Sequence, residues 1–111
     1  MEGYKRRIID TLLEKKLQAK GAVLIEGPKW CGKTTTAEEI AASKIMLSKP
    51  DIKEHFKSLI EIDTDAALAG EAPMLIDEWQ TVPKLWDAVR YTVDHRHKMG
   101  QFILTGLLYL A

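Results

Sequence analysis

The stretch GPKWCGKT, residues 27–34, constrains the fold more than any other feature of this sequence. It follows the short apolar run AVLIE, residues 22–26, and precedes TTAEEIAASK, residues 35–44, which is typical of a helix. Glycines at both ends of the loop permit unusual backbone dihedral angles and close approach of a bound group. A glycine-rich loop between a buried strand and a helix can wrap a phosphate, with its backbone N–H groups pointing inward.

The loop matches the pattern G-x-x-x-x-G-K-[ST], with Gly27, Gly32, Lys33 and Thr34 at the fixed positions. A helix that begins near Gly32 adds the positive end of its dipole. Lys33 would reach the outer phosphates, and the Thr34 hydroxyl would ligate Mg²⁺. The alternative is a glycine turn followed by a helix with a surface lysine. The predicted nucleotide-binding residues are Gly27, Pro28, Lys29, Trp30, Cys31, Gly32, Lys33, Thr34 and Thr35.

A second predicted strand, MLIDE, ends in two acidic residues, Asp77 and Glu78. An aspartate at the tip of such a strand would hold Mg²⁺ through water. A glutamate beside it would act as the general base that orients the attacking water, since a base must lie within one water of the reacting phosphate. The alternative is that both acids only favour the N-terminus of the following helix.

A third predicted strand, QFILT, ends at Thr105, which Gly106 follows. A polar residue at this strand tip can lie between the loop and the acidic pair and sense the terminal phosphate. A threonine that leaves a strand into a turn is the alternative. The predicted catalytic residues are thus Lys33, Glu78 and Thr105, and the predicted metal ligands are Thr34 and Asp77.

The remaining pattern alternates strands with helices. Two further helices are expected from apolar residues at helical spacing. The first ends before Gly21, and its apolar residues are Ile8, Ile9, Leu12, Leu13 and Leu17. The second is LWDAVRYTVDHRHK, residues 85–98, and ends before Gly100. Residues 45–72 are ambiguous, with either a helix from about Asp51 or a short strand at IEID. Alternating strands and helices predict an α/β fold in three layers, with a mostly parallel sheet.

Composition narrows the class of protein. The chain has 111 residues, 16 basic and 16 acidic, with one cysteine. Zero formal net charge argues against a broad nucleic-acid surface, although residues 1–33 hold eight Lys and Arg against four Asp and Glu. This local excess indicates a small anionic ligand. No apolar run is long enough for a membrane helix, and a single cysteine suits the reducing cytoplasm.

Three stretches together resemble a family of prokaryotic AAA-type P-loop ATPases: GAVLIEGPKWCGKTTTAEEIA, LIDEWQTVPKLWDAVRYTVDHR and GQFILTG. The likeness spans roughly residues 5–106. It implies binding of ATP or ADP with Mg²⁺, and ATP hydrolysis. The alternative is a nucleotide-binding module without turnover. In the family the P-loop corresponds to residues 27–34, the metal-site aspartate to Asp77, the catalytic glutamate to Glu78, and the sensor position to the neighbourhood of Thr105.

The resemblance also sets expectations about organisation. Family members are longer, so residues 1–111 are expected to form an incomplete ATPase domain without the family's lid and C-terminal domain. The strand at residues 22–26 normally has neighbours on both sides; without a fifth strand it becomes a sheet edge, and self-association through that edge is expected. Arg96 is either a finger for a neighbouring subunit's phosphate or a solvated side chain.

Overall fold

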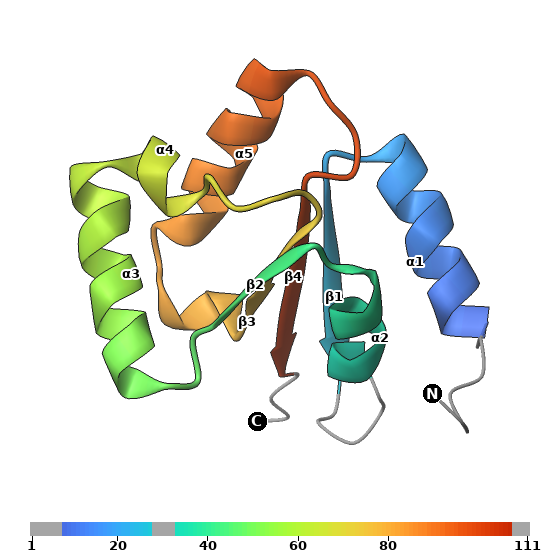
Figure 1. Cartoon of the computed structure of the whole chain (residues 1–111), viewed down its shortest axis with the longest axis horizontal. Helices are drawn as coiled ribbons and strands as arrows, with labels where there is room; N and C mark the ends of the chain where they lie inside the picture. Colours follow the sequence, from blue (N-terminus) through green and yellow to red (C-terminus); the bar gives the residue numbers. More distant parts are fainter. Residues whose placement is uncertain (1–7, 28–32, 108–111) are drawn as a thin grey trace.

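The computed structural model describes residues 8–27 and 33–107 (Figure 1). Helices and strands alternate along most of this length. In chain order the elements are α1 (Ile8–Ala19), β1 (Ala22–Gly27), α2 (Lys33–Ile40), β2 (Ser43–Met46), α3 (Pro50–Ile62), α4 (Thr64–Ala67), β3 (Met74–Asp77), the 3-10 turn η2 (Trp79–Thr81), α5 (Leu85–Arg96) and β4 (Phe102–Leu107).

The strands form one four-stranded sheet in the order β1-β4-β3-β2, and every neighbouring pair is parallel. β4 is therefore central, with the register Leu24↔Leu104 on one side and Ile76↔Leu104 on the other. Because all strands run the same way, their carboxyl ends meet at one edge of the sheet. The α/β class and the parallel sheet predicted from the sequence are confirmed.

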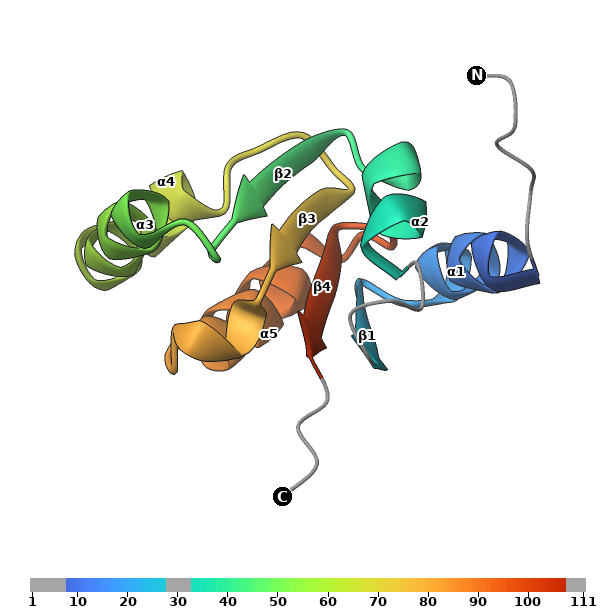
Figure 2. The same cartoon turned by 90° about the horizontal axis from the view of Figure 1, so that it is seen from below.

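Helices cover both faces of the sheet (Figure 2). α1 and α2 lie over one face, where Leu13, Leu17 and Ala37 pack against Leu75 and Ile103. The other face carries α3, α4 and α5, and its larger cluster contains the following buried residues: Leu47, Phe56, Ile60, Leu68, Met74, Ile76, Val82, Leu85, Val89, Phe102 and Leu104. Successive strand side chains point to opposite faces, so the odd-numbered residues of β3 and β4 face α2 and the even-numbered ones face α5.

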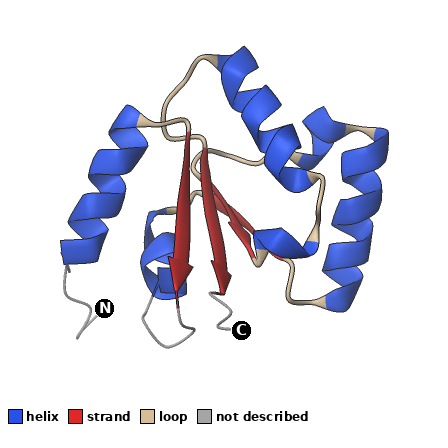
Figure 3. Ribbon diagram, turned by 180° about the vertical axis from the view of Figure 1, so that it is seen from behind, coloured by secondary structure: helices blue, strands red, loops and turns tan. Residues whose placement is uncertain are grey.

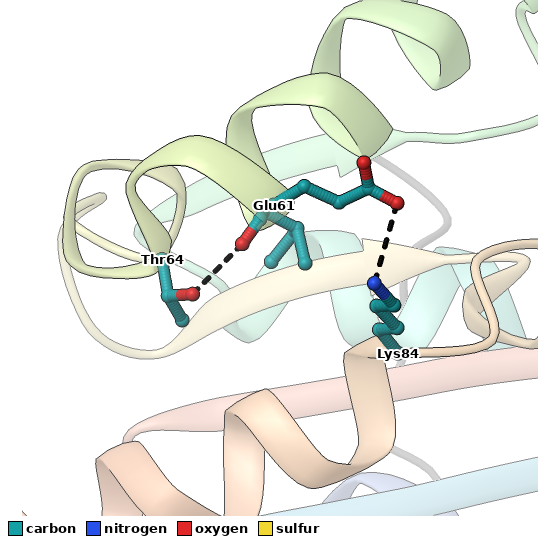
Figure 4. Close-up of polar contacts among 4 residues, drawn as sticks. Glu61, Thr64 and Lys84 are labelled. Atoms are coloured by element: carbon teal, nitrogen blue, oxygen red, sulfur yellow. Dashed lines mark hydrogen bonds and ion pairs between the residues drawn. The ribbon is translucent and has the colours of Figure 1, made fainter.

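Two polar contacts lie at the C-terminal end of α3, and one of them is an exposed ion pair with Lys84, the residue before α5. Lys84 Nζ lies 3.5 Å from Glu61 Oε1, and the Thr64 hydroxyl donates to the Ile60 carbonyl oxygen at 2.8 Å (Figure 4). α3 begins with Pro50, whose fixed φ suits the first helical turn. α3 spans Pro50–Ile62 and buries Phe56 and Ile60. The helix expected from about Asp51 is therefore confirmed, and the alternative strand at IEID is wrong.

Several predicted boundaries differ from the structure. The helix expected over residues 35–44 ends at Ile40, and Ser43–Met46 forms β2, because this segment pairs with β3. α5 ends at Arg96, with His97 in the left-handed region at φ 54°, so Gly100 is not the residue that ends it. Leu12, expected among the apolar residues of the first helix, is 51% exposed, and Trp86, in the first turn of α5, is 40% exposed.

Gly21 is required for a reason other than the helix ending expected from the sequence. Among the described glycines the positive φ belongs to Gly100, at 66°, so Gly21 does not have the left-handed conformation of a glycine that ends a helix. A Cβ added at Gly21 would lie only 2.2 Å from Val93 Cγ1 of α5. Gly21 is therefore needed because α5 packs directly on the backbone at the start of β1.

Candidate nucleotide site

Asp77 and Thr105 lie side by side at the carboxyl edge of the sheet. They occupy the same register position of β3 and β4, and the Thr105 hydroxyl donates to Asp77 Oδ1 at 2.6 Å. Both are buried, with Asp77 8% and Thr105 0% exposed. By the alternation of strand side chains both point to the face that carries α2. The structure thus brings together the predicted metal-site aspartate and the predicted sensor.

The elements that flank the glycine-rich loop meet this same edge. β1 ends at Gly27, which pairs with Leu107 just beyond Thr105, and α2 begins at Lys33 (Figure 3). Among the predicted binding residues, Thr34 and Thr35 lie in the first turn of α2, whose N-terminus carries the positive end of its dipole. The predicted residues Pro28, Lys29, Trp30, Cys31 and Gly32 lie outside the described residues.

Glu78 follows β3 directly and has an unusual backbone conformation. Its φ of 61° and ψ of 43° lie in the left-handed region, which costs a residue other than glycine about 1–3 kcal/mol. Hydrogen bonds hold it there: its N–H donates to the Thr105 carbonyl oxygen at 2.7 Å, and its carbonyl oxygen accepts from the Thr81 N–H at 3.1 Å. The chain therefore turns sharply at Glu78, immediately after the buried Asp77.

The Glu78 side chain has a partner that the sequence reasoning did not single out. Gln80 Nε2 donates to Glu78 Oε2 at 2.9 Å. The Gln80 carboxamide lies over Gly106 of β4, where an added Cβ would be 2.5 Å from Gln80 Oε1. The only signal in the sequence was an amide two residues after the glutamate and a glycine after Thr105, and neither identifies a contact by itself.

The Arg96 side chain is not simply solvated, because it contacts three residues of its own chain. Its guanidinium donates to the Leu68 carbonyl oxygen at 2.8 Å and to Gln101 Oε1 at 3.1 Å, and it stacks over the Phe102 ring at 5.3 Å. Because Gln101 and Phe102 precede and begin β4, this cluster lies at the amino end of the sheet. Arg96 is a structural residue that ties the end of α5 to the α4 region.

The donor set at the carboxyl edge fits a magnesium ion. Mg²⁺ prefers carboxylate, hydroxyl and water oxygens, and Asp77 offers a carboxylate of which one oxygen accepts the Thr105 hydroxyl. Its second oxygen makes no hydrogen bond within the described part of the chain. The predicted second ligand, Thr34, is the second residue of the neighbouring α2. The residues present are thus the types that would hold the metal.

A parallel sheet with helices on both faces, a glycine-rich loop between β1 and α2, and an acidic residue at the tip of β3 define a P-loop nucleoside-triphosphatase fold. A family model described as an AAA domain matches residues 19–108. The chain therefore belongs to the AAA domain family, as the resemblance of its motifs predicted. The comparisons with curated proteins and with solved structures found no match.

The match covers the whole span from the end of α1 through β4, so all three predicted motifs fall inside the family region. Membership supports a nucleotide-binding P-loop module. The helices of the described ranges include none that is long and apolar enough to cross a membrane.

Proposed function

We propose that this chain binds ATP with Mg²⁺ and hydrolyses it. The observation that carries the proposal is the buried contact between Thr105 and Asp77 at 2.6 Å, at the sheet edge where β1 ends and α2 begins. A buried carboxylate there, satisfied on one side by a hydroxyl, has no role in packing an apolar core. Its position beside the end of β1 and the start of α2 supports a metal-binding role.

In this proposal each predicted residue has a separate task. The backbone N–H groups of residues 27–34 and the Lys33 ammonium bind the phosphates and stabilise charge that develops on them. Thr34 and Asp77 hold the metal, which when bound neutralises phosphate charge. Glu78 orients the attacking water and accepts its proton. Thr105 is buried and acts on the phosphate site through Asp77, whose carboxylate its hydroxyl keeps in place.

The first experiment measures ATP binding and phosphate release side by side. Lys33→Ala should weaken ATP binding about 10- to 100-fold, because it removes charge-assisted hydrogen bonds to phosphate. Lys98→Ala, an exposed lysine beyond α5, is the matched control and should bind like the wild type. Equal affinity of the wild type and Lys33→Ala would refute nucleotide binding by this loop.

Glu78→Gln separates binding from turnover. It should keep ATP affinity while phosphate release falls about 10²- to 10⁴-fold, the usual contribution of a general base. Glu54→Gln, an exposed glutamate of α3, is the control. Tight binding by the wild type without any phosphate release would instead favour the second function, a nucleotide-binding module without turnover.

We further propose that the protein is cytoplasmic and self-associates through β1. Among the described strands β1 lies at an edge of the sheet, beside β4 only. Edge strands carry unpaired backbone groups that can pair with another chain, and Leu24 in this strand is 39% exposed. A second copy that pairs with β1 would cover both features.

A further inference from the structure

The orientation of the Glu78 carboxylate depends on Gln80. Gln80 Nε2 is 2.9 Å from Glu78 Oε2, and the amide nitrogen must be the atom that faces the carboxylate, since the carbonyl oxygen would repel it. The two residues belong to one turn, because Glu78 precedes η2 and Gln80 is its second residue. The contact therefore forms locally and does not wait for a ligand.

The rest of the Gln80 carboxamide has no competing partner. Gln80 Oε1 and Trp79 Nε1 are buried without a hydrogen bond to any described residue. Both flank Gly106, and a Cβ there would come 2.5 Å from Gln80 Oε1 and 3.2 Å from Trp79 Nε1. The absence of a side chain at Gly106 gives the carboxamide its space, and Glu78 provides its hydrogen bond.

The turn itself is anchored on both sides. The Trp79 ring packs against Trp86 of α5 with centroids 5.4 Å apart, and the Glu78 N–H is bonded to Thr105 of β4. The backbone of Glu78 is thereby fixed, but the rotatable bonds of its side chain are not. A long carboxylate on a fixed backbone still samples several rotamers, so a hydrogen bond at its tip is what selects one.

We propose that Gln80 is a positioning residue for hydrolysis: its amide holds the Glu78 carboxylate in the direction from which it orients water, and Gly106 provides the room. This inference rests on the proposed function, because it concerns the base of that reaction. It goes beyond that function in assigning roles to Gln80 and Gly106, to which the proposed reaction gives none. Small misplacement of a catalytic group costs up to about 100-fold in rate.

The test compares Gln80→Ala and Gln80→Glu with the wild type in single-turnover phosphate release and in ATP binding. Gln80→Glu keeps the shape of the side chain but cannot donate from its ionised carboxylate. Both variants should release phosphate about 10- to 100-fold more slowly at unchanged ATP affinity. Gln18→Ala, an exposed glutamine of α1, is the matched control and should behave as the wild type.

A background variant separates positioning from a general structural role. In Glu78→Asp the shortened side chain no longer reaches the amide, so adding Gln80→Ala should cause no further loss of rate. A further loss in that background, or a loss of ATP affinity in parallel, would show that Gln80 acts on the fold and would overturn the inference. Faster turnover in Gln80→Ala would also overturn it, because the contact would then restrain the base.

A second readout does not require turnover. The side-chain amide resonances of Gln80, assigned by their loss in Gln80→Ala, should shift in Glu78→Gln when observed by ¹⁵N NMR. Unchanged resonances would refute the contact. A wild type that hydrolyses ATP and is indifferent to Gln80 overturns this inference alone, whereas a wild type that binds ATP without hydrolysis overturns the proposed turnover and this role together.

Discussion

Asp77 is a buried carboxylate at the carboxyl edge of the sheet, where the proposed metal site lies. It is 8% exposed, and its described hydrogen-bond partner is the Thr105 hydroxyl. An ionised carboxylate in such a place is costly unless polar groups surround it. The Thr105 hydroxyl supplies one such group, and the predicted metal would supply the other. The buried positions of Asp77 and Thr105 therefore depend on the hydrogen bond between them, and loss of either side chain should destabilise the fold.

Replacing Thr105 by Val should destabilise the protein, because it leaves Asp77 Oδ1 buried without its hydrogen bond. The free energy of unfolding should fall by about 1–3 kcal/mol, measured by urea denaturation. Thr105→Ser keeps the hydroxyl and should lose less, and Thr11→Val, on the exposed side of α1, serves as the control. A Thr105→Val variant as stable as the wild type would show that Asp77 does not need this contact.

At the scale of elements, the contact between α5 and the start of β1 determines how closely two layers approach. Gly21 precedes β1, and its backbone carbonyl accepts from the N–H groups of Gln101 at 2.9 Å and Phe102 at 3.1 Å. Val93 of α5 fills the space above it, with Cγ1 2.2 Å from where a Cβ would stand. Both groups are rigid, since one is backbone and the other is a β-branched side chain.

Gly21→Ala should therefore be destabilising, by about 1–3 kcal/mol, the usual cost of overpacking. The same substitution in a Val93→Ala background should cost less, because the clashing methyl groups are gone. Chemical denaturation of the four proteins in this double-mutant cycle measures the coupling. Additive effects of the two substitutions would contradict the proposed contact.

The whole molecule presents β1 at one side of its sheet, with β4 as its described neighbour. The run AVLIE has apolar residues on both faces, as strands buried within parallel sheets do. Leu12 of α1 and Trp86 of α5 are also partly exposed. A strand with this composition at an edge favours association with another strand.

The proposed association through β1 predicts that Leu24→Lys, which places a charge on this strand, is monomeric under conditions in which the wild type has a larger mass. Light scattering coupled to size-exclusion chromatography, over a range of protein concentrations, measures the mass. Ile62→Lys, at a position 83% exposed at the end of α3, is the control and should leave the mass unchanged. A wild type that stays monomeric at high concentration would refute self-association.

Sequence alone determined the features that depend on local pattern. The spacing of Gly27, Gly32 and Lys33 identified the loop, and apolar runs ending in polar residues identified β1, β3 and β4. From these followed the parallel sheet and the neighbouring positions of Asp77 and Thr105, since parallel strands of one sheet end at one edge. The roles of the loop, of Lys33 and of Glu78 stay predictions.

Only the tertiary structure decided what depends on contacts between distant segments. It placed Ser43–Met46 in a strand, because pairing with β3 outweighs local preference in so short a segment. It also showed that Gly21 accommodates Val93, that Arg96 ties α5 to Leu68, and that Gly106 accommodates Gln80. Periodicity reports which face of an element is buried, but not which side chain from another element will meet it there.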